Sequence, residues 1–208
     1  MFVIKRAPVV LGLALIGMAL IGKAQPASAE DNVRIRGTIE QVDGAVYLIK
    51  ARDGADVKLT LADKPNLVAT VPAVVADIKP GTFIGSAGTM QPDGTQKASE
   101  VHIFPEAMRG VGEGHYDWDL KPLNKMTNAN VEQTVKGVDG QILSVKYKGG
   151  EKKLLLTPET VVVAFVPGDG ADLKPATHIF VPGAKKQPDG TLVSPVMIYG
   201  KDGLTPPM

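Results

Sequence analysis

Apolar and polar residues alternate along most of the chain. Val33, Ile35 and Ile39 fall on one side of an extended segment. Arg34 and the other intervening residues fall on the opposite side. A period of two is typical of a half-buried β-strand. Short alternating segments of this kind recur throughout the sequence with little room for helix, so the pattern predicts an all-β protein.

Three turn motifs occur twice, about 95 residues apart, which indicates an internal duplication. The matching pairs are 42–44 with 138–140 (Val-Asp-Gly), 76–80 with 171–175 (Ala-Asp-Ile-Lys-Pro and Ala-Asp-Leu-Lys-Pro), and 91–95 with 187–191 (Gln-Pro-Asp-Gly-Thr). Asp-Gly pairs are turn residues, because glycine supplies the positive φ that tight turns require.

The duplication predicts two tandem units. Each unit reads as a meander of short strands interrupted by one helical turn, which is typical of a small OB-like Greek-key β-barrel. We expect one barrel at 30–104 and a second at 131–208, which includes a C-terminal tail. Residues 105–130 would form a linker docked between them. A β-sandwich built from each unit is the alternative.

The turn motifs also carry a family resemblance. Gly37-Thr38-Ile39-Glu40, the Val-Asp-Gly motif, 77–82 (Asp-Ile-Lys-Pro-Gly-Thr), Asp93-Gly94-Thr95 and a final Val-x-Ile strand resemble the exported bacterial DUF5666 family and other exported OB-fold domains. The likeness covers 33–104 and 129–199. The second copy departs from the pattern, with Ala176 in place of Gly81. The resemblance implies the fold and implies no established activity.

The first 29 residues have the organisation of an export signal. Lys5 and Arg6 form a basic start, 7–22 is an apolar stretch, and 27–29 (Ala-Ser-Ala) is a small-residue cleavage site. We expect cleavage after Ala29, a periplasmic location and no stable membrane insertion afterwards. An uncleaved membrane anchor is the alternative.

Composition excludes several kinds of chemistry. The chain has no cysteine, which excludes disulfides, a thiol nucleophile and thiolate metal sites. Three of its 23 basic residues and none of its 22 acidic residues lie in the signal segment, so the remainder carries 20 basic and 22 acidic residues. A near-neutral chain with interspersed charges and few aromatic residues argues against nucleic-acid binding.

Aromatic and ionisable residues are concentrated between the two units, where linkers usually carry small polar residues. We take Tyr116, Trp118 and Arg109 as candidate ligand-binding residues in a groove between the barrels. The alternative is that Tyr116 and Trp118 are packing anchors that dock the linker. In either case we expect Trp118, the only tryptophan, to lie wedged between the barrels.

The same segment suggests a metal site. His115, Asp117 and Asp119 stand at alternate positions of an extended segment and would project to one side, close to His102. Two neighbouring methionines, Met108 and Met126, would favour copper in such a divalent site.

Two of the histidines have a structural interpretation instead. Aligning the two copies places Met197 at the position of His102 and Phe83 at that of His178. Neither position then requires an imidazole ring, and no specific cofactor is required.

Catalytic motifs are missing from the sequence. The serines have no Gly-x-Ser-x-Gly context. The sequence therefore predicts a non-enzymatic binding or accessory protein that contacts an envelope protein or glycan. The alternatives are a copper or zinc carrier and an uncharacterised hydrolase.

Overall fold

The computed structural model describes residues 32–137 and 140–208. The protein is all-β, as predicted, with four short 3-10 turns besides the strands of these ranges. The expected signal segment 1–29 and the motif residues Val138 and Asp139 lie outside the described residues. In the described part, no helix has the length and apolar character needed to cross a membrane.

Two closed five-stranded barrels can be traced among the described strands. In the first barrel, β1 pairs with β2 and β11, β2 with β3, and β11 with β12, all antiparallel, while a parallel β12–β3 pairing closes the ring. Its strands are β1 (Asn32–Asp43), β2 (Val46–Ala51), β3 (Asp56–Pro72), β11 (His178–Lys186) and β12 (Leu192–Gly200).

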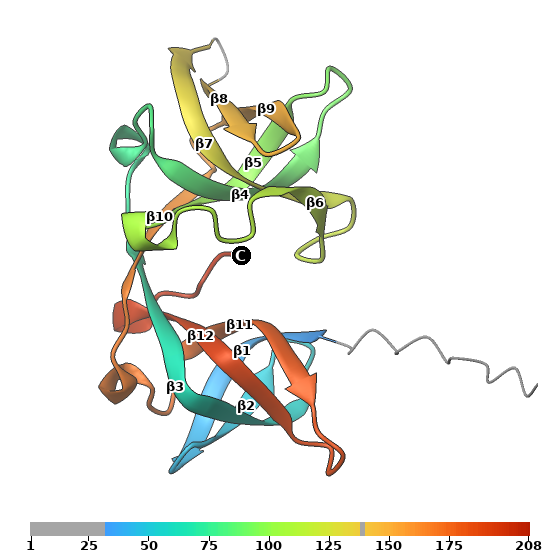
Figure 1. Cartoon of the computed structure of the whole chain (residues 1–208), viewed down its shortest axis with the longest axis vertical. Helices are drawn as coiled ribbons and strands as arrows, with labels where there is room; N and C mark the ends of the chain where they lie inside the picture. Colours follow the sequence, from blue (N-terminus) through green and yellow to red (C-terminus); the bar gives the residue numbers. More distant parts are fainter. Residues whose placement is uncertain (1–31, 138–139) are drawn as a thin grey trace, which may run out of the picture.

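The second barrel has the same strand order. A parallel β5–β9 pairing closes it through Gln96 with Leu154 and Lys97 with Leu155. Its strands are β4 (Phe83–Met90), β5 (Gln96–Ile103), β7 (Asn124–Lys136), β8 (Gln141–Tyr147) and β9 (Gly150–Leu156). Strand β10 (Val161–Pro167) pairs with β3 and with β5 and so connects the two rings (Figure 1).

The two repeats exchange strands, and this corrects the expectation that each repeat closes its own barrel at 30–104 and 131–208. The first barrel combines β1–β3 of the first repeat with β11–β12 of the second. The second combines β7–β9 with β4–β5. The arrangement is an intrachain counterpart of domain swapping, in which equivalent elements are exchanged between two copies.

The exchange takes place where β3 passes from the first barrel to its pairing with β10. The pattern predicts separate strands at 57–61 and 67–71, but the structure joins them into β3, with Lys64 in the left-handed region at φ 53°. The far end of β3 leaves the first barrel and pairs antiparallel with β10, with Thr70 opposite Phe165 at the centre. Phe165 follows Thr70 by 95 residues. Equivalent positions therefore meet at a local two-fold axis.

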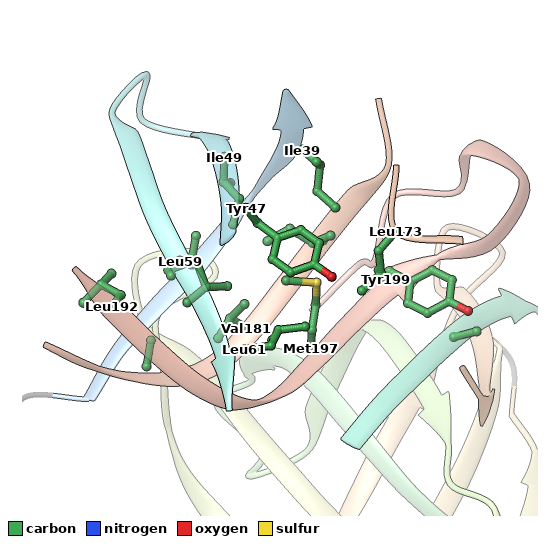
Figure 2. Close-up of a cluster of buried hydrophobic side chains, with 14 residues drawn as sticks. Ile39, Tyr47, Ile49, Leu59, Leu61, Leu173, Val181, Leu192, Met197 and Tyr199 are labelled. Carbon is green, nitrogen blue, oxygen red and sulfur yellow. The ribbon is translucent and has the colours of Figure 1, made fainter. Parts of the chain in front are cut away.

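Three apolar clusters follow from this arrangement. One fills the first barrel, where side chains such as Ile39, Tyr47 and Met197 point inward (Figure 2). A second fills the second barrel around Ile84 and Leu143. The third lies between the barrels, because strands such as β4 and β12 bury both faces.

The expected linker is partly strand. Residues 124–130 belong to β7, and β6 (Gly114–Trp118) pairs with β7 at its outer edge. The chain ends between the two barrels (Figure 1), where Met208 is buried. The 3-10 turns are η1 (Val75–Asp77), η2 (Glu106–Met108), η3 (Gly170–Asp172) and η4 (Lys201–Gly203).

Candidate functional site

A pocket of about 440 Å³ lies within the third cluster, between the two barrels. Both barrels and the segment between β5 and β7 contribute to its walls. Apolar side chains on the walls include Phe104, Met126, Phe165, Phe180, Val196 and Ile198. Side chains with polar atoms there include Arg34, Asn66, His102, Tyr116, Trp118 and Asn128. A mostly apolar, aromatic cavity with a few polar groups is the usual form of a small-molecule site.

The register of the strands shows which wall residues are equivalent. Gly85 pairs with His102 in the second barrel, and Phe180 pairs with Ile198 in the first. Phe180 follows Gly85 by the 95 residues that separate the motifs before these strands. The counterpart of His102 is therefore Ile198, which corrects the expected match with Met197 by one position.

The same register matches the neighbours of the pair. Glu100 pairs with Ala87 in the second barrel. The corresponding positions of the first barrel are Val196 and Pro182. One barrel therefore has a buried Glu-x-His pair, with His102 on the pocket wall and Glu100 behind it, where its copy has two aliphatic residues.

Glu100 and His102 form a buried carboxylate–imidazole pair. Their exposed fractions are 1% and 4%. Glu100 Oε1 accepts a hydrogen bond from the Ala87 N–H at 2.9 Å, and Oε2 lies 3.1 Å from His102 Nδ1. Because the carboxylate accepts, Nδ1 donates in this contact, and the tautomer with its hydrogen on Nδ1 has Nε2 as an acceptor. The imidazole stacks on Phe165 at 4.8 Å between ring centres.

Nε2 occupies space that a glycine leaves open. A Cβ on Gly85 would overlap His102 Nε2 and lie 2.5 Å from Asn128 Oδ1. In the first barrel the place of Gly85 is taken by Phe180. Asn128 is 6% exposed, and its Nδ2 donates to the Val111 carbonyl at 3.2 Å. Oδ1 faces the glycine and has no hydrogen-bond partner among the described residues.

Tyr116 and Trp118, two of the candidate ligand-binding residues, line the pocket. Trp118 is half-buried, and its ring contacts Phe180 edge-on with centroids 6.0 Å apart. The Arg34 guanidinium lies 4.4 Å from the indole centroid. Trp118 Nε1 is buried, and the described residues offer it no hydrogen-bond partner. Burial raises the pKa of Tyr116 above its ordinary value, against a smaller opposite effect of Arg34.

Asp119 ties this segment to the first barrel. It lies 2.7 Å from the Arg36 guanidinium and 3.6 Å from that of Arg34. Partial burial alone would raise the pKa of Asp119, but the hydrogen bond from Arg36 and the two positive charges outweigh it and leave this pKa lowered. The segment 114–119 is thus bound to the second barrel by the pairing of β6 with β7, and to the first by Trp118 and the ion pairs of Asp119.

Arg109 does not line the pocket. Its guanidinium binds the Glu106 carboxylate through two contacts of 2.6 Å and also donates to the Gly81 carbonyl and Asn130. This residue joins the 3-10 turn after β5 to the second barrel. Its choice as a ligand-binding residue is therefore not supported by its position.

The four candidate metal ligands do not come together. His115 contacts Thr127 Oγ1 at 2.8 Å, Asp117 binds Lys125, and Asp119 binds the arginines. His102 lies on the pocket wall and contacts Glu100 behind it. No group of three or more His, Cys, Asp or Glu residues suited to a metal ion occurs in the described part of the chain.

The pKa values in this segment follow from these separate contacts. The hydrogen bond from Lys125 lowers the pKa of Asp117. Burial, together with Lys152 and Lys125, lowers the pKa of His115. Each side chain is thus already engaged by a partner within the fold.

Sequence reasoning missed Glu100, Asn128 and the phenylalanines of the pocket. Glu100 could have been found by aligning the last strands with an offset of 96, as Gln91 and Gln187 are aligned. That alignment sets Glu100 and His102 against two aliphatic residues. The phenylalanines carried no signal of their own, because large apolar residues are usual in any core.

Comparisons with protein-family models, with curated protein sequences and with solved structures found no match to this chain.

Proposed function

We propose that this chain is a non-enzymatic binding protein whose ligand is a small, mainly apolar molecule held between the two barrels. The pocket itself is the observation that carries the proposal. Its size is within the range of ligand sites, and its walls offer aromatic surface from both barrels. Apolar walls suit such a molecule better than a glycan, which needs many hydrogen-bond partners.

Buried polar atoms without partners support a ligand. Asn128 Oδ1 and Trp118 Nε1 lie at the pocket without hydrogen bonds among the described residues. A buried polar group left unpaired costs about 1–3 kcal/mol. A molecule that enters the pocket with a matching polar group would remove this cost. In a cluster that only stabilises the fold, the unpaired polar atoms would lower stability without any benefit.

The setting of this function follows from the sequence. The N-terminal signal motif supports export, cleavage after Ala29 and a periplasmic role. The charge balance argues against nucleic acid, and an envelope protein or glycan remains a proposed contact for the outer surface. We propose that each barrel is OB-like, which the Greek-key strand order with one parallel pair supports. Membership of the DUF5666 family is a proposal on the same footing.

An enzymatic role has one observation in its favour. The Glu100–His102 pair orients an imidazole as catalytic carboxylate–histidine pairs do. A hydrolase also needs a nucleophile or an activated water beside Nε2, and no serine lines the pocket in the described chain. Proton transfer at His102 is therefore the second candidate function, after binding.

Binding can be tested with two-ring aromatic compounds such as naphthalene. Titration into the mature chain should raise the melting temperature and change the emission of Trp118, because the ligand would lie against its ring. In Ile198→Phe, which fills the pocket from the first barrel, both effects should disappear. Val135→Phe adds the same ring at a position that is 55% exposed and serves as the matched control. Equal responses of both variants would refute the pocket as the site.

A further inference from the structure

We infer that the ligand carries a hydrogen-bond donor, such as a phenolic hydroxyl or an aromatic amino group, which binds between His102 and Asn128. This inference rests on the proposed function, because it concerns the polar end of the molecule in the same pocket. It comes from two acceptor atoms, His102 Nε2 and Asn128 Oδ1, that face the space above Gly85.

In the His102 tautomer with its hydrogen on Nδ1, the hydrogen-bond network turns both atoms toward Gly85 as acceptors. His102 Nδ1 is turned to the Glu100 carboxylate, which also holds the Ala87 N–H, so the ring is oriented by a group that cannot donate. Asn128 cannot exchange its oxygen and nitrogen without cost. Its Nδ2 faces the Val111 carbonyl, and an oxygen in that place would meet another acceptor.

Among the described residues no hydrogen bond reaches Asn128 Oδ1, and His102 Nε2 lies beside it over Gly85. An O–H or N–H group of a ligand would satisfy one or both of them. A ligand carboxylate would face two lone pairs next to the buried charge of Glu100, which is unfavourable. Aromatic rings on both sides, from Phe165 and Phe104 around the imidazole and from Trp118 and Phe180 farther along, favour an aromatic body for the molecule.

The first barrel provides an internal comparison. At the positions of Gly85 and His102 the first barrel has Phe180 and Ile198. The first barrel therefore forms the same strand pair without the polar recess, by which we mean the two acceptor atoms over Gly85. A glycine in the middle of a strand weakens the strand unless something must approach closely. In the second barrel that close approach is made by His102 Nε2, which indicates that the recess is a specific feature of this wall.

A set of matched probes tests the donor requirement by calorimetry with the mature chain. 2-Naphthol carries the donor, 2-methoxynaphthalene replaces its hydrogen with a methyl group, and 2-naphthoate carries a carboxylate. We expect 2-naphthol to bind at least about 10-fold more tightly than either, since discrimination by buried hydrogen-bonding groups commonly reaches or exceeds this factor. Equal affinities for 2-naphthol and its methyl ether would overturn the inference and leave the proposed function standing. If none of the three binds, the proposed function fails as well.

Two pocket variants and one control variant show where the donor binds. His102→Ile copies the first barrel and should bind both neutral probes equally, while His178→Ala, outside the pocket, should keep the wild-type preference. Gly85→Ala places a methyl group against His102 Nε2 and Asn128 Oδ1, which must move away from it, so this variant should also abolish the preference. It serves as a second measurement should His102→Ile fold poorly. A preference that survives in both pocket variants would show that the donor binds elsewhere, and the inference would be wrong.

Discussion

Glu100 and His102 are ionisable residues at positions where the other barrel uses Val196 and Ile198. Burying a hydrogen-bonded carboxylate and its partner seldom stabilises a fold more than apolar residues of similar volume do. Part of the role of Glu100 is nevertheless structural, because it accepts the Ala87 N–H. The first barrel avoids this need, since the residue equivalent to Ala87 is Pro182, which has no N–H to satisfy. We therefore expect the pair to serve mainly to orient His102 at the pocket, and to contribute little to the stability of the barrel.

The first prediction concerns a variant in which three residues of the second barrel are replaced by the residue types at the equivalent positions of the first. The triple variant Ala87→Pro, Glu100→Val, His102→Ile should keep the wild-type free energy of unfolding or gain about 1–4 kcal/mol, because a buried pair is replaced by an apolar copy. It should lose any preference for 2-naphthol. Urea denaturation measures the first effect and calorimetry the second.

The single variant Glu100→Val is the control for the triple variant. It leaves the Ala87 N–H and His102 without their acceptor and should cost about 3 kcal/mol or more. A triple variant that is destabilised as much as the single variant would mean that the pair is structural. The polar recess would then need another explanation.

At the level of elements, β6 supplies two of the pocket's aromatic wall residues, Tyr116 and Trp118. This strand pairs with β7 of the second barrel, and its last residue, Trp118, reaches Phe180 of the first. Asp119 adds the contacts with Arg34 and Arg36. The segment thus bridges both barrels at the pocket rather than serving as a free linker.

The second prediction tests this bridge through Trp118. Trp118→Ala removes a half-buried ring from the third cluster and should lower the free energy of unfolding by about 3 kcal/mol. Trp118→Phe keeps an aromatic ring there and should cost less. Thermal and urea denaturation measure both. Native emission already at the wavelength of a fully hydrated indole would contradict the bridge.

The third prediction concerns acid. The pKa of Asp119 is lower in the folded protein than its ordinary 3.8, so its ion pairs contribute stability above about that pH, and the contribution is lost as the pH falls through the lowered value. The emission of Trp118 should therefore stay constant from neutral pH to about pH 4 and shift to the red below it. In Asp119→Asn the red shift should be present at neutral pH. An unchanged neutral spectrum in that variant would argue against the bridge.

At the scale of the whole molecule, the exchange of strands places the third cluster, and with it the pocket, between the barrels. β3 and β10 cross at the local two-fold axis, and β4, β5, β11 and β12 each complete the barrel that the other repeat began. Both repeats are therefore needed for each barrel, and the pocket has walls from both.

The strands and turns were predictable because period-two alternation and Asp-Gly turns are local signals. The exchange was not predictable. The inward residues of β5, such as Val101, and those of β12, such as Met197, suit either barrel, because the two repeats share one pattern. Trp118 and Tyr116 could be found as unusual linker residues. Asn128 became part of the site only through its distance from Gly85, which no spacing in the sequence expresses.

Cysteine cross-linking tests the exchange most directly, and the chain has no cysteine of its own to interfere. Thr60 in β3 is paired with Val193 of the second repeat, and the equivalent residue of the first repeat is Lys97. Adjacent strands lie about 4.8 Å apart, which is within reach of a disulfide. The account predicts that Thr60→Cys/Val193→Cys forms an intrachain disulfide in the folded monomer, detected by mass spectrometry without reductant, whereas Thr60→Cys/Lys97→Cys stays reduced. The opposite result would contradict the exchange and the shared pocket built on it.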